Sequence, residues 1–276
     1  MIKKLQLTVI ALLTIFLGFS QDLEKIKGSR NVVTEITELS PFNRLVIGDD
    51  FEIKILQGLA PSVQIEADDN LFNALSFEVQ DGSLKFNKLQ RITSKKRFNI
   101  TVIVKDSLKV IELKNNAELA SGNTLELTDF TLITNENARA YLTLNATNFN
   151  FTNNDKCKAE LNVTADTATL NLNDSTDLKA LINTSNTVIT MLSNAYAKIE
   201  GDTSDLNITT DNSTTLKAEK FTSKNCNLIT KDKSDVYIDV KSDLVLEASG
   251  STETYIHGTP KIELNVFENS AILRKK

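Results

Sequence analysis

Hydrophobic and polar residues alternate along most of the chain after residue 40, and in the second half this alternation recurs every 18 to 20 residues. Alternation with period two is the pattern of a β-strand that buries one face. Strands that recur at a fixed spacing indicate a solenoid, in which each turn packs on its neighbours. The pattern predicts an all-β protein with about eight regular rungs over residues 114–276, and it favours a parallel β-helix.

Each predicted rung contains a corner and a second alternating strand. The corner carries Asn, Asp or Gly, residues that tolerate a left-handed backbone and bond locally. The corner positions are Asn116, Asn137, Asp155, Asp174, Asn194, Asn212, Asp232, Gly250 and Asn269. The expected inward pairs of the second strand are Phe130 and Leu132, Phe149 and Phe151, Ala168 and Leu170, Val188 and Thr190, Leu206 and Ile208, Cys226 and Leu228, Leu244 and Leu246, and Ile262 and Leu264. Stacking in register would align these pairs in apolar ladders, and stacked Asn side chains could bond between rungs.

The repeat also decides the expected state of the two cysteines. Eight rungs at the inter-strand spacing of roughly 4.8 Å make a rod on the order of 40 Å long. Cys157 and Cys226 would then lie roughly 15–17 Å apart along it. A disulfide needs Cα atoms within about 7 Å. We therefore expect two unpaired thiols that face inward as small apolar residues.

Residues 40–113 alternate less regularly, and we expect them to form either a cap or the first irregular coils of a single β-helix domain over residues 40–276. Residues 21–39 form a polar N-terminal segment. Asp68, Asp69 and Asn70 precede an apolar run and predict a short helix with an Asx cap. The same acidic cluster, like Asp49 and Asp50, is interpreted as a solvated turn, with Ca²⁺ binding as the alternative.

The first 20 residues have the features of a secretory signal peptide. Lys3 and Lys4 precede an apolar run from Leu5 to Phe16, and a cleavage site is expected before Gln21. A membrane anchor is the alternative, although the run is short for a spanning helix. We expect export to the periplasm, the outer surface or the medium, with no membrane span in the mature chain. The formal net charge of −5 argues against nucleic acid as a partner.

Three segments resemble the opening of a bacterial family described as "putative autotransporter adhesin, head GIN domain", which is typical of Bacteroidetes. They are Phe42–Gly58, Val63–Leu71 and Val79–Phe86. The later Ser249-Gly250-Ser251 and Ile256-His257-Gly258 resemble serine- and glycine-rich rungs of that family, so the resemblance covers about residues 35–276. It implies a right-handed parallel β-helix that is exported and associated with the cell surface. It supplies no catalytic residues, and this chain has Asn, Asp or Thr where many rungs of the family would carry Gly.

The residues offer little for catalysis. His257 is the only histidine, so any catalytic triad would have to use it, and the usual zinc ligand sets are absent. Asp155, Asp174 and Asp232 are candidate carboxylates for a polysaccharide lyase or hydrolase. Asn occupies the same corner position in other rungs, which indicates selection for backbone geometry. We expect no catalytic, cofactor or metal site.

The first functional hypothesis is therefore a non-enzymatic binding, adhesin-like or scaffolding module at the cell envelope, with a protein or glycan partner. Tyr141, Tyr237 and Tyr255 fall on equivalent strand positions and could form a contact surface, or they could pack at rung edges. A carbohydrate-active β-helix enzyme is the second hypothesis, which a groove with two or three carboxylates and a basic residue would favour. A self-associating structural protein is the third.

Overall fold

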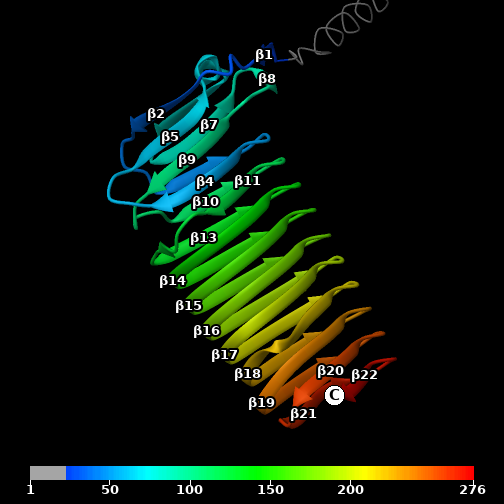
Figure 1. Cartoon of the computed structure of the whole chain (residues 1–276). Coiled ribbons are helices and arrows are strands. Elements are labelled where there is room, and N and C mark those ends of the chain that lie inside the picture. The colour runs from blue at the N-terminus through cyan, green and yellow to red at the C-terminus, as the bar shows by residue number, and fades with distance from the viewer. Residues whose placement is uncertain (1–22) are drawn as a thin grey trace, which may run out of the picture.

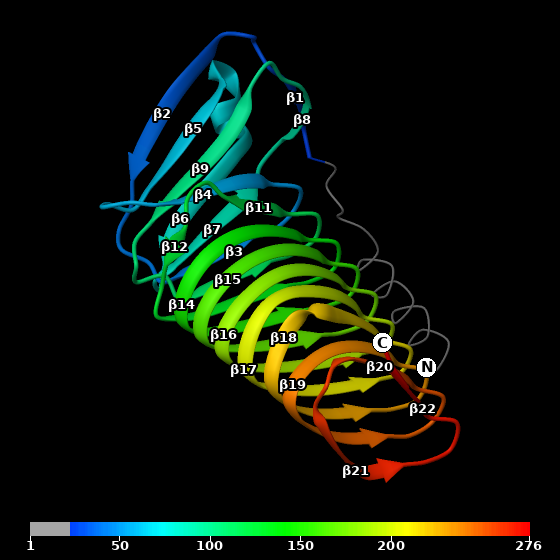
Figure 2. The same ribbon diagram turned by 60° about the horizontal axis from the view of Figure 1, so that its bottom comes forward.

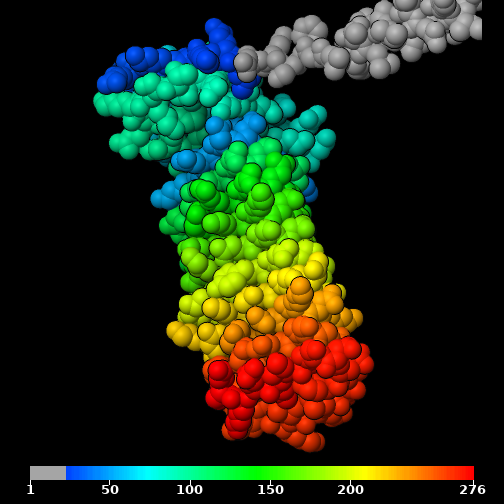
Figure 3. Space-filling model, turned by 90° about the vertical axis from the view of Figure 1, so that its right-hand side faces the viewer, coloured from blue at the N-terminus to red at the C-terminus, as the bar shows by residue number. Residues whose placement is uncertain are grey.

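A computed structural model describes residues 23–276, and the predicted signal peptide lies outside the described residues. The described chain is a β-solenoid of about nine turns. Figure 1 shows the strands stacked as the rungs of a rod, and the space-filling view shows the sequence as successive bands along it (Figure 3). The prediction of an all-β solenoid is confirmed.

Six long strands form the regular part of the rod. They are β14 (Arg139–Asn153), β15 (Lys158–Leu172), β16 (Asp177–Leu192), β17 (Tyr196–Asp211), β18 (Thr215–Thr230) and β19 (Asp235–Ala248). Each pairs in parallel with the next. Each also bends midway, so that its first half lies on one side of the rod and its second half on the other (Figure 2). Every regular rung is therefore one bent strand and one tight corner.

In the rungs next to these six strands, separate short strands replace the one long strand, and the break falls at the position of the bend. On one side, β11 (Glu118–Ser121) and β12 (Leu125–Glu126) pair with the first half of β14, and β13 (Asp129–Thr134) pairs with its second half. At the other end, β20 (Glu253–Gly258) and β21 (Lys261–Phe267) divide β19 in the same way, and β22 (Ile272–Lys275) pairs with β20. The solenoid consequently has two separate outer faces, one from the first halves and one from the second halves.

The interior is built from apolar ladders, as the alternation predicts. Phe130 and Phe149 pair in register, and their rings stack with centroids 6.0 Å apart. The predicted inward pairs are buried in every rung from β13 to β19 except one. In β21, Ile262 and Leu264 continue the ladder from Leu244 and Leu246 but remain 43% and 49% exposed. The prediction of their position is confirmed, whereas their burial is not.

The exception is β16, where the expected inward pair Val188 and Thr190 is wrong. Val188 is 40% exposed, and the inward positions belong to Thr187, Ile189 and Met191. Thr187 is fully buried because its hydroxyl lies 2.6 Å from that of Thr184 and so has a hydrogen-bond partner. The prediction assumed that valine faces inward and threonine outward. In β16 the polar Thr187 faces inward and Val188 outward, so the predicted inward positions are displaced by one residue.

Left-handed backbone marks the corners, as expected. Positive φ angles occur at Asp155 (60°), Asp174 (60°), Asp232 (55°) and Gly250 (82°), and the corners in between carry two such residues each. In the two earlier rungs the prediction was displaced by one residue, because Asn115 and Glu136 adopt the positive φ in place of Asn116 and Asn137. The left-handed residues are therefore 21 positions apart from Asn115 to Glu136 and 19 apart from Glu136 to Asp155.

The predicted amide ladder is present one residue before the corner. Asn154 donates from Nδ2 to Oδ1 of Asn135 at 2.8 Å, and Asn173 donates in the same way to Asn154 at 2.9 Å. Because the Asn154 amide donates to one neighbouring rung and accepts from the other, the ladder links the register of three rungs.

Both cysteines are free and buried, which confirms the prediction. Cys226 lies in the second ladder between Leu206 and Leu244. Burial raises the pKa of the Cys157 thiol to about 11 and that of Cys226 to about 12. Both thiols therefore stay protonated near neutral pH and behave as apolar side chains.

The N-terminal end departs from the regular rungs. Its strands are β1 (Lys25–Lys27), β2 (Val32–Glu38), β3 (Arg44–Ile47), β4 (Glu52–Gln57), β5 (Ser62–Asp68), β6 (Leu75–Gln80), β7 (Ser83–Lys88), β8 (Arg91–Ser94), β9 (Phe98–Val104) and β10 (Val110–Leu113). β3 and β4 pair in parallel with β10 and β11 as rung strands. β5 runs antiparallel to both β2 and β9, and β6 runs antiparallel to β7. These antiparallel strands extend the sheet at the end of the rod where a further rung would stack.

The acidic cluster at residues 68–70 has a structural role that the sequence did not predict. A 3-10 helix, η1 (Asp69–Ala74), follows it, but Asp68 makes no side-chain cap. The Asp68 side chain is instead fully buried and accepts backbone N–H bonds from Arg30, Lys96 and Arg97, each at 3.1 Å. The interpretation of Asp68 as a solvated turn is wrong, because its carboxylate joins three segments of the N-terminal end.

Candidate functional site

One column of outward side chains follows the first halves of the strands. From β14 to β20 the residues in register are Tyr141, Glu160, Lys179, Lys198, Lys217, Tyr237 and Tyr255. Neighbours in this column are one rung apart, so the column is on the order of 29 Å long at about 4.8 Å per rung. The structure thus places the three predicted tyrosines at equivalent positions in a single column.

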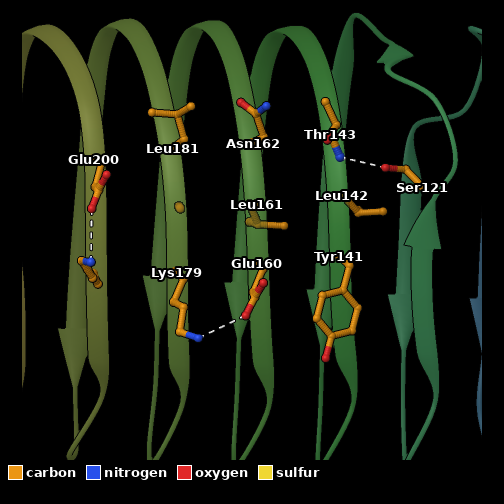
Figure 4. A pocket seen from close by; sticks show the side chains of 12 residues that line it. Ser121, Tyr141, Leu142, Thr143, Glu160, Leu161, Asn162, Lys179, Leu181 and Glu200 are labelled. Carbon is orange, nitrogen blue, oxygen red and sulfur yellow. Dashed lines mark hydrogen bonds and ion pairs between the residues drawn. The ribbon is translucent and has the colours of Figure 1, made fainter.

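A shallow groove of about 550 Å³ lies along the first part of this column (Figure 4). It crosses the rungs from β11 to β17, so its long direction follows the rod. Polar side chains that point outward from these rungs line it, together with the half-exposed Leu181. They are Ser121, Tyr141, Thr143, Glu160, Asn162, Lys179, Lys198 and Glu200. Figure 4 shows the Tyr141 ring face-on at one end, which leaves the flat face of the ring open to a ligand.

Ion pairs organise the charges of the groove. Nζ of Lys179 lies 3.1 Å from Oε1 of Glu160, and Nζ of Lys198 lies 3.2 Å from Oε1 of Glu200. Lys220 also approaches Glu200, at 3.8 Å. The hydrogen bond from Lys198 and the charge of Lys220 hold the pKa of Glu200 below its usual value, and the bond to Glu160 raises the pKa of Lys179. Both shifts favour the charged forms of Glu200 and Lys179.

The far end of the column carries a stacked aromatic pair. The rings of Tyr237 and Tyr255 lie 4.3 Å apart between centroids and are inclined by only 4°. The Tyr255 hydroxyl donates to Glu253, and this hydrogen bond raises the pKa of Tyr255 to about 12. Each ring covers one face of the other, and Nζ of Lys276 lies 5.0 Å from the centroid of the Tyr255 ring. The pair is therefore already packed against protein groups, unlike the Tyr141 ring that lines the groove.

A fourth tyrosine, which sequence reasoning missed, belongs to the same surface. Tyr196 begins β17 and lies in register with Asp177 and Thr215, two residues before the Lys198 position. The chain has four tyrosines and no tryptophan, so all of its tyrosines lie on the outer surface of the first halves of β14–β20. We call this surface the Tyr face. A search for every tyrosine at an outward strand position would have found Tyr196.

The opposite surface has a different composition. The second halves of β13–β19 contain no arginine or tyrosine, and their one lysine is Lys224, next to the bend of β18. Their outward positions are mostly Asn, Thr and Asp, joined from rung to rung by bonds such as Asn227 Nδ2 to Asn207 Oδ1 at 3.0 Å and Asn225 Nδ2 to Asp205 Oδ1 at 2.8 Å. We call this surface the amide face. Tyrosine is therefore confined to one side of the regular rod, and lysine is much more frequent on that side.

The remaining candidate groups are dispersed. Asp155, Asp174 and Asp232 adopt positive φ at exposed corners, and Asp155 accepts a 2.8 Å bond from the backbone N–H of Glu136. His257 lies in β20, in register with Asp239. Within residues 23–276, no group of three or more His, Cys, Asp or Glu residues is placed to hold a metal ion. The corner carboxylates thus serve local backbone geometry and do not converge.

The groove itself contains two carboxylates beside lysines, the composition that the enzymatic hypothesis requires. Glu160 and Glu200 lie two rungs apart, roughly 10 Å along the rod. A glycosidase needs one carboxyl with a raised pKa as the general acid, whereas the pKa of Glu200 is lowered. Each of the two carboxylates of the groove is thus paired with a lysine, and the pKa of Glu200 is shifted away from the value that a general acid needs.

Comparison with known proteins identifies the family. A family model described as "Putative auto-transporter adhesin, head GIN domain" matches residues 41–181 and 155–260. The chain belongs to the head GIN domain family. The prediction made from its opening segments is confirmed.

Solved structures share the fold of this head GIN domain protein at low sequence identity. A "putative adhesin" of Parabacteroides distasonis has a TM-score of 0.64 and 13% identity, covering 91% of this chain and 100% of that one. A "putative lipid binding protein" of the same species has a TM-score of 0.60 and 15% identity, covering 92% and 100%. A "putative adhesin" of Parabacteroides merdae has a TM-score of 0.58 and 17% identity, covering 92% and 99%. No curated protein matches the chain.

Membrane insertion by helices finds no support in the described part of this head GIN domain protein. Among residues 23–276, no helix is long and apolar enough to cross a bilayer.

Proposed function

We propose that this protein is an exported, non-enzymatic binding module of the cell envelope that contacts its partner with the Tyr face. The observation that carries the proposal is the confinement of all four tyrosines to one outer face of the rod. Tyrosine combines apolar area with a hydroxyl and is enriched at binding surfaces. The family and the solved structures named adhesins support a binding role.

The contact surface comprises Tyr141 and its groove, together with Tyr237, Tyr255 and Tyr196 on the same face. Rigid, fully paired rungs hold these side chains in fixed columns, so little conformational entropy is lost when a partner binds. Residues 40–276 act as one binding unit, since a single cluster of buried side chains extends from Phe42 to Ile256. The predicted signal peptide and the family membership support export to the envelope.

An enzymatic role is disfavoured by the chemistry of the groove. Lysines neutralise both of its carboxylates, and the single histidine lies in β20, beyond the groove-lining residues. A partner is therefore expected to be retained rather than converted.

The test compares the two faces. The purified full chain is screened on a glycan array and in pull-downs from envelope extracts, alongside Tyr141→Ala and the amide-face variant Val188→Ala. Because truncation of an aromatic anchor typically costs more than 1 kcal/mol of binding, Tyr141→Ala should weaken binding by about tenfold. Val188→Ala should bind like the unaltered protein.

Circular dichroism melting of each variant establishes that the rungs remain folded. Binding that survives Tyr141→Ala and Tyr196→Ala but is lost on substitution of the amide face would contradict the proposal. Turnover of a glycan by the unaltered protein would contradict its non-enzymatic part.

A further inference from the structure

The centre of the column on the Tyr face is basic, although the chain as a whole carries a net charge of −5. Lys179, Lys198 and Lys217 occupy the same position in three consecutive rungs. Like charges directly opposite one another in a sheet are unfavourable. Glu160 and Glu200 offset two of these charges, but within residues 23–276 Lys217 has no ion-pair partner. The column therefore places three ammonium groups about 4.8 Å apart, two in exposed ion pairs that a ligand can compete for and one without a partner.

From this arrangement we infer that the partner is an acidic polysaccharide lying along the rod, with carboxylates on Lys179, Lys198 and Lys217 and a sugar ring on Tyr141. The inference rests on the proposed function and names the ligand class of that same surface. A linear polymer with an acidic group on successive sugars suits a column that repeats one ammonium per rung. The groove runs across the rungs, so it follows the direction that such a chain would take.

The other groups of the groove suit a sugar better than a peptide. Tyr141 presents the flat face of its ring, and Asn162 and Thr143 beside it offer an amide and a hydroxyl to sugar hydroxyls (Figure 4). A peptide commonly binds a sheet by adding a strand to a free edge. Strands β14–β18 are paired on both sides, so the groove offers no such edge.

The experiment uses the full chain with three probes of matched length: a polygalacturonate oligomer, a neutral galactan oligomer and polyglutamate. The column variant is Lys179→Gln, Lys198→Gln and Lys217→Gln together. The matched control removes the same three charges from exposed corners, through Lys156→Gln, Lys231→Gln and Lys233→Gln. Binding is measured by calorimetry at low and physiological salt, and melting curves report folding.

We expect the unaltered protein to bind polygalacturonate, more weakly as salt increases. The column variant should bind about tenfold more weakly, since each exposed ion pair contributes roughly two- to threefold. The corner control should remain within about twofold of the unaltered protein. Equal affinity for neutral galactan, preference for polyglutamate, or an equal loss in the corner control would each overturn the inference.

The outcomes separate this inference from the proposed function. If polygalacturonate does not bind but Tyr141→Ala still weakens capture of another partner, the acidic-glycan inference fails while the Tyr face remains the contact surface. If neither the column variant nor Tyr141→Ala alters any binding that the protein shows, both fail.

Discussion

The Tyr face and the amide face are formed by the same bent strands, yet their outward side chains make different interactions. On the amide face, polar side chains bond mainly to the same position in the next rung, as between Asn225 and Asp205. On the Tyr face, Lys179 also bonds to Glu160 of the next rung, but Lys217 has no ion-pair partner among residues 23–276 and the Tyr141 ring lines the groove. Side chains whose bonds are satisfied along the rod have less capacity for a partner. The amide face therefore stabilises the stack, whereas the Tyr face retains Lys217 and Tyr141, two groups on which the proposed binding role rests.

The comparison of the two faces depends first on which side chains of the second halves point inward. In β16, Thr187 points into the core and Val188 points to solvent. Thr187→Asp should bury an unpaired charge and lower the free energy of unfolding by about 4 kcal/mol or more. Val188→Asp should change it by no more than about 0.5 kcal/mol, because the side chain enters solvent. Urea denaturation of the two variants measures both values, and a larger loss for Val188→Asp would reverse the assigned faces.

A smaller effect is expected at the N-terminal end, where stability depends on one carboxylate. Burial alone would raise the pKa of Asp68, but its bonds from the backbone N–H groups of Lys96, Arg97 and Arg30 outweigh this and lower it. A carboxyl whose pKa is lower in the folded state contributes stability above its unfolded pKa of about 3.9, and this contribution is lost as the pH falls through the folded value. The strands joined by Asp68 should therefore open in acid before the regular rungs.

Hydrogen exchange read by mass spectrometry checks this order of opening. Below pH 4, protection in β2 and β9 should fall while β15–β18 stay protected, and Asp68→Asn should show the same loss at neutral pH. The matched control is Asp166→Asn, because Asp166 is exposed and lies between the two paired halves of β15. This variant should leave protection unchanged. Simultaneous loss of protection in all strands would show that the two regions unfold as one unit.

Much of this architecture could be predicted from the sequence because a solenoid repeats its local rules. Alternation gave the strands, and corner residues such as Asp155 and Asp174 gave the period. The prediction erred at Thr187, where hydrogen bonds to other threonines make a polar residue acceptable inside. It erred at Asp68, because the three N–H groups that it binds are distant in sequence.

The candidate site was predictable only in part, for a related reason. Equivalent positions put Tyr141, Tyr237 and Tyr255 in one column without any knowledge of the fold. Tyr196 lies two residues earlier in its strand and was missed, because only one equivalent position after each corner was compared. The ion pairs of the groove join side chains from different rungs or different columns, so spacing alone did not indicate them.

The smallest expected effect distinguishes the two kinds of tyrosine on the Tyr face. Tyr237 and Tyr255 stack on each other, so Tyr237→Ala should lower the free energy of unfolding by about 0.5–1.5 kcal/mol more than the loss of buried apolar area alone would.

The two kinds of tyrosine should also differ in ionisation. In the unaltered protein, ultraviolet titration should detect a tyrosine that ionises only near the pKa of about 12 that the bond to Glu253 imposes on Tyr255. Glu253→Gln removes the negative charge and should return that ionisation toward the usual value of about 10. Tyr141→Phe serves as the control, because it removes a different tyrosine and should leave the late ionisation in place. If the late ionisation disappears in Tyr141→Phe and persists in Glu253→Gln, the open ring and the stacked pair have been assigned the wrong way round.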